Sequence, residues 1–252
     1  KANEKYHYQL AIGKGVRAPN LTERYINHFN VGLDAYEYVG NPELKPEKNY
    51  QTDFSIHKTG DMLSFEVNVF ASYLTNFIDG VIDTTLDKKF MPCQPPANAK
   101  RFENIDEAFQ AGYEISAKYS FSKNLSIEGN LYYTYAQNLV TNEPLSEIPP
   151  LSSTIALNYK NKKFYSIISA RFAAEQKRFA ESAGETPSDA FNTLDLKIGY
   201  KPLKMIEFDF GINNIFNANY YEHLNRPFKN LPLQSQFYEP GRNFIFSIRL
   251  KF

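Results

Sequence analysis

Tryptophan is missing from this 252-residue sequence, cysteine occurs once, and neither sign of charge is in excess. A single cysteine cannot form a disulfide bond within the chain, so no intrachain disulfide bond stabilises this fold. The 28 basic side chains match the 28 acidic ones. Nucleic acid is therefore not expected as a partner, because proteins that bind it concentrate positive charge. No apolar run approaches the roughly 18 residues that a transmembrane helix needs, so any contact with a membrane must use β-structure.

Hydrophobic residues make up 42% of the chain and charged residues 22%, a balance that excludes a disordered protein. Aromatic residues reach 15%, and Tyr and Phe gather toward the ends of apolar segments, as at Tyr73, Tyr135 and Tyr200. Amphipathic rings in such positions are typical of the headgroup level of a membrane. The pattern resembles two aromatic girdles.

Ten segments alternate apolar and polar residues, which predicts β-strands with one apolar and one polar face. The first covers residues 6–12, where Tyr6, Tyr8 and Leu10 alternate with small or polar residues. The other nine cover residues 50–56, 63–73, 109–121, 125–135, 151–159, 164–172, 194–200, 206–212 and 244–252. None of the apolar positions is charged, whereas the positions between them carry many charges. A lipid-facing barrel wall requires such a face, although a soluble β-sandwich also has one buried face.

The lengths of the connections separate these two folds. Long and short connections alternate along the chain. The long ones are residues 14–47, 79–100, 137–150, 175–190 and 214–241, and the short ones are residues 58–61, 121–124, 160–163 and 201–205. Antiparallel strands joined in this way place every long loop on one side. The sequence therefore predicts an all-β, antiparallel transmembrane barrel with long extracellular loops and short periplasmic turns.

Six segments resemble landmarks of TonB-dependent outer-membrane receptors, and they occur in the order found in that family. RAPNLTE at residues 17–23 and NPELKPE at residues 41–47 resemble its paired RAPNLxE and NPxLxPE signatures. The other four are RFENIDEA at 101–108, EIPP at 147–150, NNIFNANY at 213–220 and EPGRNF at 239–244. The resemblance covers essentially the whole chain.

Members of this family have a barrel of about 22 strands whose lumen is plugged by an N-terminal domain. The resemblance implies that residues 1–252 form the C-terminal part of such a barrel, without the plug, the TonB-contacting segment and roughly twelve strands. It implies an outer-membrane receptor for the energy-dependent uptake of a scarce metal chelate, namely a ferric siderophore, haem or copper. No enzyme activity and no cofactor are expected. The implied partners are the chelate, the TonB complex, outer-membrane lipid and lipopolysaccharide, and the barrel-assembly machinery through the C-terminal Phe252.

Residues for ligand binding are sought in the long loops. Haem-uptake members of the family carry a ligand histidine between the two signatures, and His28 lies in that interval. Met91 and Cys93 are candidate soft ligands for copper. The stretch from Tyr221 to Arg226 resembles one found in metal-uptake receptors. The full set of candidate ligand contacts is Arg17, Tyr25, His28, Tyr36, Tyr38, Arg178, His223 and Arg226, which offer charge and stacking to an anionic or aromatic chelate.

Each candidate also has a plainer interpretation. A lone loop histidine is usually solvated or hydrogen-bonded, Met91 and Cys93 can pack inside a loop, and the arginines can position loops or contact lipopolysaccharide. Two other classes of protein stay open. One is a self-contained ten-stranded outer-membrane barrel, either a porin or an enzyme with an acid–base pair of His28 and Asp34 in its loops. The other is a soluble β-sandwich that serves as a binding module.

Overall fold

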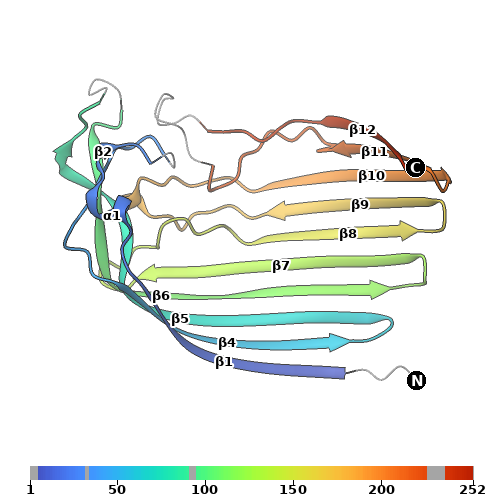
Figure 1. Cartoon of the computed structure of the whole chain (residues 1–252), viewed down its shortest axis with the longest axis horizontal. Coiled ribbons are helices and arrows are strands. Elements are labelled where there is room, and N and C mark those ends of the chain that lie inside the picture. Colours follow the sequence, from blue (N-terminus) through green and yellow to red (C-terminus); the bar gives the residue numbers. More distant parts are fainter. Residues whose placement is uncertain (1–4, 32–33, 91–94, 226–235, 252) are drawn as a thin grey trace.

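The computed structural model describes residues 5–31, 34–90, 95–225 and 236–251. Ten strands follow one another in a single antiparallel meander (Figure 1). They are β1 (Lys5–Arg17), β4 (Glu47–Thr59), β5 (Leu63–Asp87), β6 (Asn98–Ser120), β7 (Leu125–Asn138), β8 (Ser152–Lys160), β9 (Phe164–Ala173), β10 (Phe191–Leu203), β11 (Ile206–Asn213) and β12 (Asn243–Leu250). The ten predicted strands are confirmed, as is the antiparallel all-β class.

The two ends of the sheet differ in the way that the connection lengths predict. Figure 1 shows the tight turns β4–β5, β6–β7, β8–β9 and β10–β11 at one end, on the right, where β1 also begins and β12 ends. The long connections gather at the opposite end, on the left. The alternation of long loops and short turns is therefore confirmed.

The two faces of the sheet also differ. Val69 in β5 pairs with Phe54 in β4 and with Tyr113 in β6, and its side chain is 46% exposed on the apolar face. Along such strands the register keeps apolar residues beside one another, because side chains alternate between the faces. The opposite face carries a hollow of about 350 Å³ whose lining includes His57, Glu66, Lys118, Glu128, Asn130 and Thr154. No helix within the described ranges is long and apolar enough to span a membrane.

The hairpin of β5 and β6 extends much further than its alternating pattern predicts. A loop is expected at residues 79–100, but β5 continues to Asp87 and β6 already begins at Asn98, with Asp83 paired to Ala99. Backbone hydrogen bonds continue beyond the alternating segments at residues 63–73 and 109–121, where neither face of the hairpin has to exclude charge. Apolar and polar residues therefore need not alternate in this part of the hairpin. The sequence pattern does not reveal where β5 ends and where β6 begins.

The first long loop carries short elements that the periodicity also does not predict. They are α1 (Leu21–Tyr25), β2 (Asn27–Phe29) and β3 (Tyr38–Val39), and the loop between β9 and β10 holds a 3-10 turn, η1 (Glu181–Ala183). β3 pairs with β2 and lies parallel to β6, so the first loop adds to the extended hairpin. A small apolar core of Leu74, Ala108, Ala136 and Leu145 lies where this layer of loops meets the strands.

Candidate functional site

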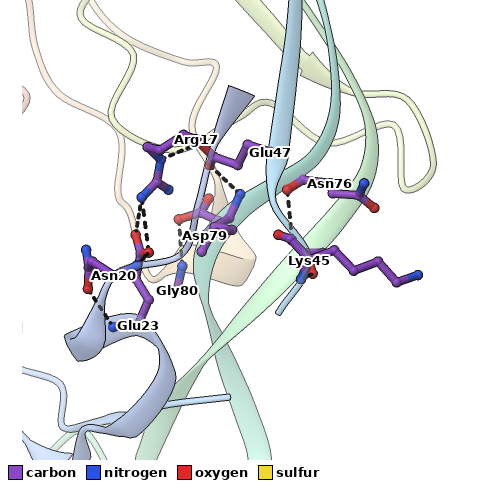
Figure 2. Close-up of polar contacts among 10 residues, drawn as sticks. Arg17, Asn20, Glu23, Lys45, Glu47, Asn76, Asp79 and Gly80 are labelled. Atoms are coloured by element: carbon purple, nitrogen blue, oxygen red, sulfur yellow. Dashed lines mark hydrogen bonds and ion pairs between the residues drawn. The ribbon is translucent and has the colours of Figure 1, made fainter. Parts of the chain in front are cut away.

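The two signatures, residues 17–23 and 41–47, meet at the base of the first long loop (Figure 2). The Arg17 guanidinium donates to both oxygens of Glu23, at 2.8 and 3.0 Å, and through Nε to Glu47 at 2.5 Å. The second oxygen of Glu47 accepts the backbone N–H of Ile78 at 2.7 Å. We call Arg17, Glu23 and Glu47 the loop-base cluster. It ties the start and the end of the first loop to β5.

The same cluster begins the helix α1. The Asn20 side chain accepts from the Glu23 N–H at 2.9 Å, and the Glu23 carboxylate accepts from the Asn20 N–H at 2.7 Å, which forms a capping box. The N–H of Asn41 donates to the Glu23 carbonyl at 2.9 Å. At Gly40 a Cβ atom would lie 2.5 Å from the carbonyl carbon of Arg24, so only glycine allows this approach.

Asparagine side chains of other family-like segments also donate hydrogen bonds to the backbone of neighbouring loops and strand residues. Asn104 of the RFENIDEA segment donates to the carbonyl oxygens of Asn76 and Lys45, at 2.8 and 3.1 Å. The Asn214 side chain donates to the Ala218 carbonyl at 2.8 Å. These motifs hold the loops in place, and the ligand candidates other than Arg17 lie between them.

His28 lies at a distortion of the small β2–β3 pair. Asn27 pairs with Val39 and Phe29 pairs with Tyr38, which leaves His28 as the additional residue of a bulge, with φ at 53°. A bulge redirects a side chain, and histidine is among the residues that tolerate positive φ. The His28 side chain consequently points inward and is only 7% exposed, whereas both neighbours are exposed.

The partner of His28 is the buried carboxylate of Glu37. Its Oε2 lies 3.2 Å from Nδ1 of His28 and accepts the Lys89 N–H at 2.9 Å, while its Oε1 accepts the Phe90 N–H at 2.7 Å. Glu37 therefore joins the first loop to the loop between β5 and β6. His28 is hydrogen-bonded rather than solvated.

A cavity of about 300 Å³ opens beside this pair; we call it the His28 cavity. Its lining includes His28, Phe29, Asn30, Ala35, Glu37, Lys88 and Phe90. Phe29 and Phe90 meet edge to face, with ring centroids 6.4 Å apart. The cavity combines aromatic walls with an imidazole, a carboxylate and an ammonium group, a combination that suits a flat and largely apolar molecule with a few polar groups.

A buried ion pair lies beneath the first loop. Lys100 of β6 is 1% exposed, and its ammonium forms an ion pair with Asp34 and lies 3.3 Å from the Tyr38 hydroxyl, which itself donates to Asp34 at 2.9 Å. The same ammonium lies 4.6 Å from the centre of the Tyr36 ring. The structure thus places Tyr36 and Tyr38 around a buried lysine. Asp34 contacts Lys100 and Tyr38, whereas His28 contacts Glu37.

Tyr36 and His223 line a second cavity, where three long loops meet. Its lining also includes Gly184, Tyr221 and Asn225. Nδ1 of His223 lies 3.0 Å from the Ser188 hydroxyl. Burial raises the pKa of Tyr221 above its ordinary value, so its phenol stays protonated and can donate hydrogen bonds.

The remaining predicted contacts do not share these cavities. Tyr25 is exposed at the end of α1. Arg178 stacks on the ring of Tyr135 at 4.3 Å and donates to Gln137 at 2.6 Å, so it packs one loop against β7. Three predicted ligand residues and the assembly signal lie outside the described residues: Met91, Cys93, Arg226 and Phe252.

Sequence reasoning missed Glu37, Phe29 and Phe90. No periodic pattern marks these residues, because they lie in a distorted strand and in a loop. Their proximity depends on the β2–β3 bulge and on the length of the β5–β6 hairpin. Within the described ranges, no three His, Cys, Asp or Glu side chains gather closely enough to hold a metal ion by themselves.

The architecture is that of an outer-membrane barrel wall with a layer of extracellular loops. A family model described as "TonB dependent receptor-like, beta-barrel" matches residues 2–215. The chain belongs to this family of outer-membrane receptors and transporters, whose members are not enzymes. The family, fold and outer-membrane localisation expected from the sequence are thereby confirmed.

Similar proteins are named for binding several different ligands. "Probable hemoglobin and hemoglobin-haptoglobin-binding protein 4" of Haemophilus influenzae is 26% identical over 281 residues, which cover 97% of this chain and 28% of that protein. "Transferrin-binding protein A" of Neisseria meningitidis serogroup B is 22% identical, with 94% and 30% covered. This chain therefore spans less than a third of these curated relatives.

Solved structures show the same fold. The "Copper transporter OprC" superposes with a TM-score of 0.82 at 22% identity, covering 100% of this chain and 38% of that one. The ferric enterobactin receptor of Pseudomonas aeruginosa superposes with a TM-score of 0.72 at 18% identity, covering 98% and 38%. At these identities the likeness concerns the fold alone.

Proposed function

We propose that this chain is part of a TonB-dependent receptor that takes up haem across the outer membrane. The observation that carries the proposal is the His28 cavity on the long-loop side of the barrel. One imidazole nitrogen supplies one coordination bond, which suits a metal that a chelator already holds with a position left open. Haem has this property, and the rings of Phe29 and Phe90 match its flat apolar surface.

The proposal extends to the whole receptor and its partners. β1 and β12 are the outer strands of the described sheet, and each has one edge available for further strands of a wider barrel. The polar hollow on the inner face suits a plug, and TonB would supply energy through a segment outside this chain. Lipid and lipopolysaccharide would cover the apolar face, and Phe252 would be read by the barrel-assembly machinery.

Growth on a single metal source tests the proposal. Cells that express the full-length receptor as their only uptake route are supplied with haemin, ferric enterobactin or a copper salt, in the presence or absence of TonB. We expect TonB-dependent use of haemin. We expect His28→Ala to lower haemin binding at least about tenfold, because loss of a ligand should cost no less than loss of its hydrogen-bonding partner.

The matched control is His57→Ala, because His57 lies near the C-terminal end of β4. Figure 1 shows the turn that follows β4 at the end of the sheet opposite the long loops. This variant should use haemin as the unchanged receptor does. Equal haemin binding by the receptor and by His28→Ala would contradict the haem proposal. TonB-dependent uptake of only the siderophore or copper would reassign the cargo.

A further inference from the structure

The three bonds to Glu37 determine which nitrogen of His28 carries a proton. Glu37 is buried and accepts two backbone N–H groups, one on each oxygen. An ionised carboxylate has only acceptors to offer, so the contact of 3.2 Å with His28 requires a proton on Nδ1. In the neutral imidazole Nε2 then has no proton, and its lone pair is available.

The same carboxylate also fixes the geometry of the cavity. It bonds to the imidazole that forms one wall and to the backbone N–H of Phe90, whose ring forms another. The bulge at His28 directs the imidazole toward Glu37, away from the direction of its exposed neighbours. Two loops distant in sequence are thus held in one arrangement by one side chain.

We infer that Glu37 is a positioning residue that holds His28 as the Nδ1–H tautomer and presents Nε2 to a metal with an open coordination position. This inference rests on the proposed function and assigns a role that Glu37 performs through His28. A carboxylate behind a ligand histidine fixes its ring and raises its basicity, and loss of such a partner typically lowers metal affinity about 10- to 100-fold.

The test uses the full-length receptor in detergent, with ¹⁵N-labelled histidine and with haemin as the probe. Glutamine at position 37 can donate its amide N–H to Nδ1 if it gives up the bond that the same position accepts from the Lys89 N–H, and this arrangement favours the Nε2–H tautomer. We expect Glu37→Gln to shift the His28 nitrogen signals, assigned by their loss in His28→Ala, toward that tautomer. We also expect a loss of haemin affinity of about 10- to 100-fold. In the His28→Ala background the same change should have no further effect.

Two variants separate positioning from general loop damage. Glu23→Gln alters another buried carboxylate of the same loop, bonded to Asn20 and Arg17, and should leave the tautomer of His28 unchanged. Glu37→Asp keeps an ionised acceptor and should retain the Nδ1–H tautomer. An unchanged tautomer in Glu37→Gln, or the same tautomer change in Glu37→Asp, would overturn the inference.

The inference and the proposed function fail in different ways. The tautomer is measured without haemin, so a receptor that shows the tautomer change but binds no haemin contradicts the haem proposal and supports the Nδ1–H assignment. Haemin binding that requires His28 but is unaffected by Glu37→Gln supports the haem proposal and overturns the role of Glu37.

Discussion

Ion pairs differ in burial between two regions of the molecule. One region is the sheet of ten strands, which we call the strand wall, and the other is the set of long loops at its end, which we call the loop layer. In the wall, Lys118 and Glu128 lie 3.8 Å apart on the polar face, and their side chains are 52% and 47% exposed. In the loop layer, Lys100 and Asp34 form an ion pair whose side chains are 1% and 5% exposed. Exposed pairs contribute little, whereas removal of one partner from a buried pair is strongly destabilising. The wall is therefore held by its backbone ladder, and the loops by buried polar contacts.

The largest difference should appear when each ion pair is broken in the full-length receptor. Lys100→Met removes the cation beside a buried carboxylate, and we expect it to lower the local opening free energy of residues 34–39 by about 3–5 kcal/mol. Lys118→Met, the matched change in the wall, should cost at most about 1 kcal/mol. Hydrogen exchange of the backbone amides measures both. Equal protection in the two variants would show that the buried pair does not hold the loop.

A charge on the apolar face of the wall should have the next largest effect. Val69→Arg places a cation in lipid, and we expect it to lower the free energy of unfolding by about 2–4 kcal/mol in vesicles. Asn68→Arg is the control, because Asn68 immediately precedes Val69 in β5 and its side chain donates a hydrogen bond to Glu66 on the polar face. If both arginines are tolerated equally, the apolar face is not the lipid-facing one.

The same contrast explains what the sequence could and could not predict. The wall repeats with a period of two because lipid excludes charge from one face, so its ten strands and its turns are visible in the pattern. The loop layer has no such constraint. His28 was a candidate from its place between two motifs, but Glu37 and Lys100 look like ordinary surface charges until the bulge and the long hairpin bury them.

The family-like motifs differ from both the wall and the loop layer. They could be recognised by resemblance, although no physical reason for their residues was apparent from the sequence. Arg17 is the clearest example. It was predicted to contact the chelate, and in the structure it bonds to two carboxylates at the base of the loop. Contact between Arg17 and a chelate stays a prediction, whereas its bonds to Glu23 and Glu47 explain why an arginine occurs at this position.

The smallest expected effect concerns two glycines, Gly40 in the loop layer and Gly13 in the strand wall. Gly40→Ala would place a Cβ 2.5 Å from the backbone of α1, which cannot yield as a flexible side chain does. We expect a cost of about 1–3 kcal/mol, the usual range for overpacking, and a loop that opens more readily. Protease cleavage of the first loop on intact cells measures this opening.

Gly13→Ala in β1 provides the matched control, since a Cβ there meets no atom within 4 Å. Alanine at that position should leave both the folded barrel and the protease resistance of the loop unchanged, because β1 keeps its backbone pairing with β4. If Gly40→Ala is also neutral, the contact between Gly40 and α1 does not fix the loop. The buried pair of Lys100 and Asp34, the loop-base cluster and Glu37 would then hold the loop.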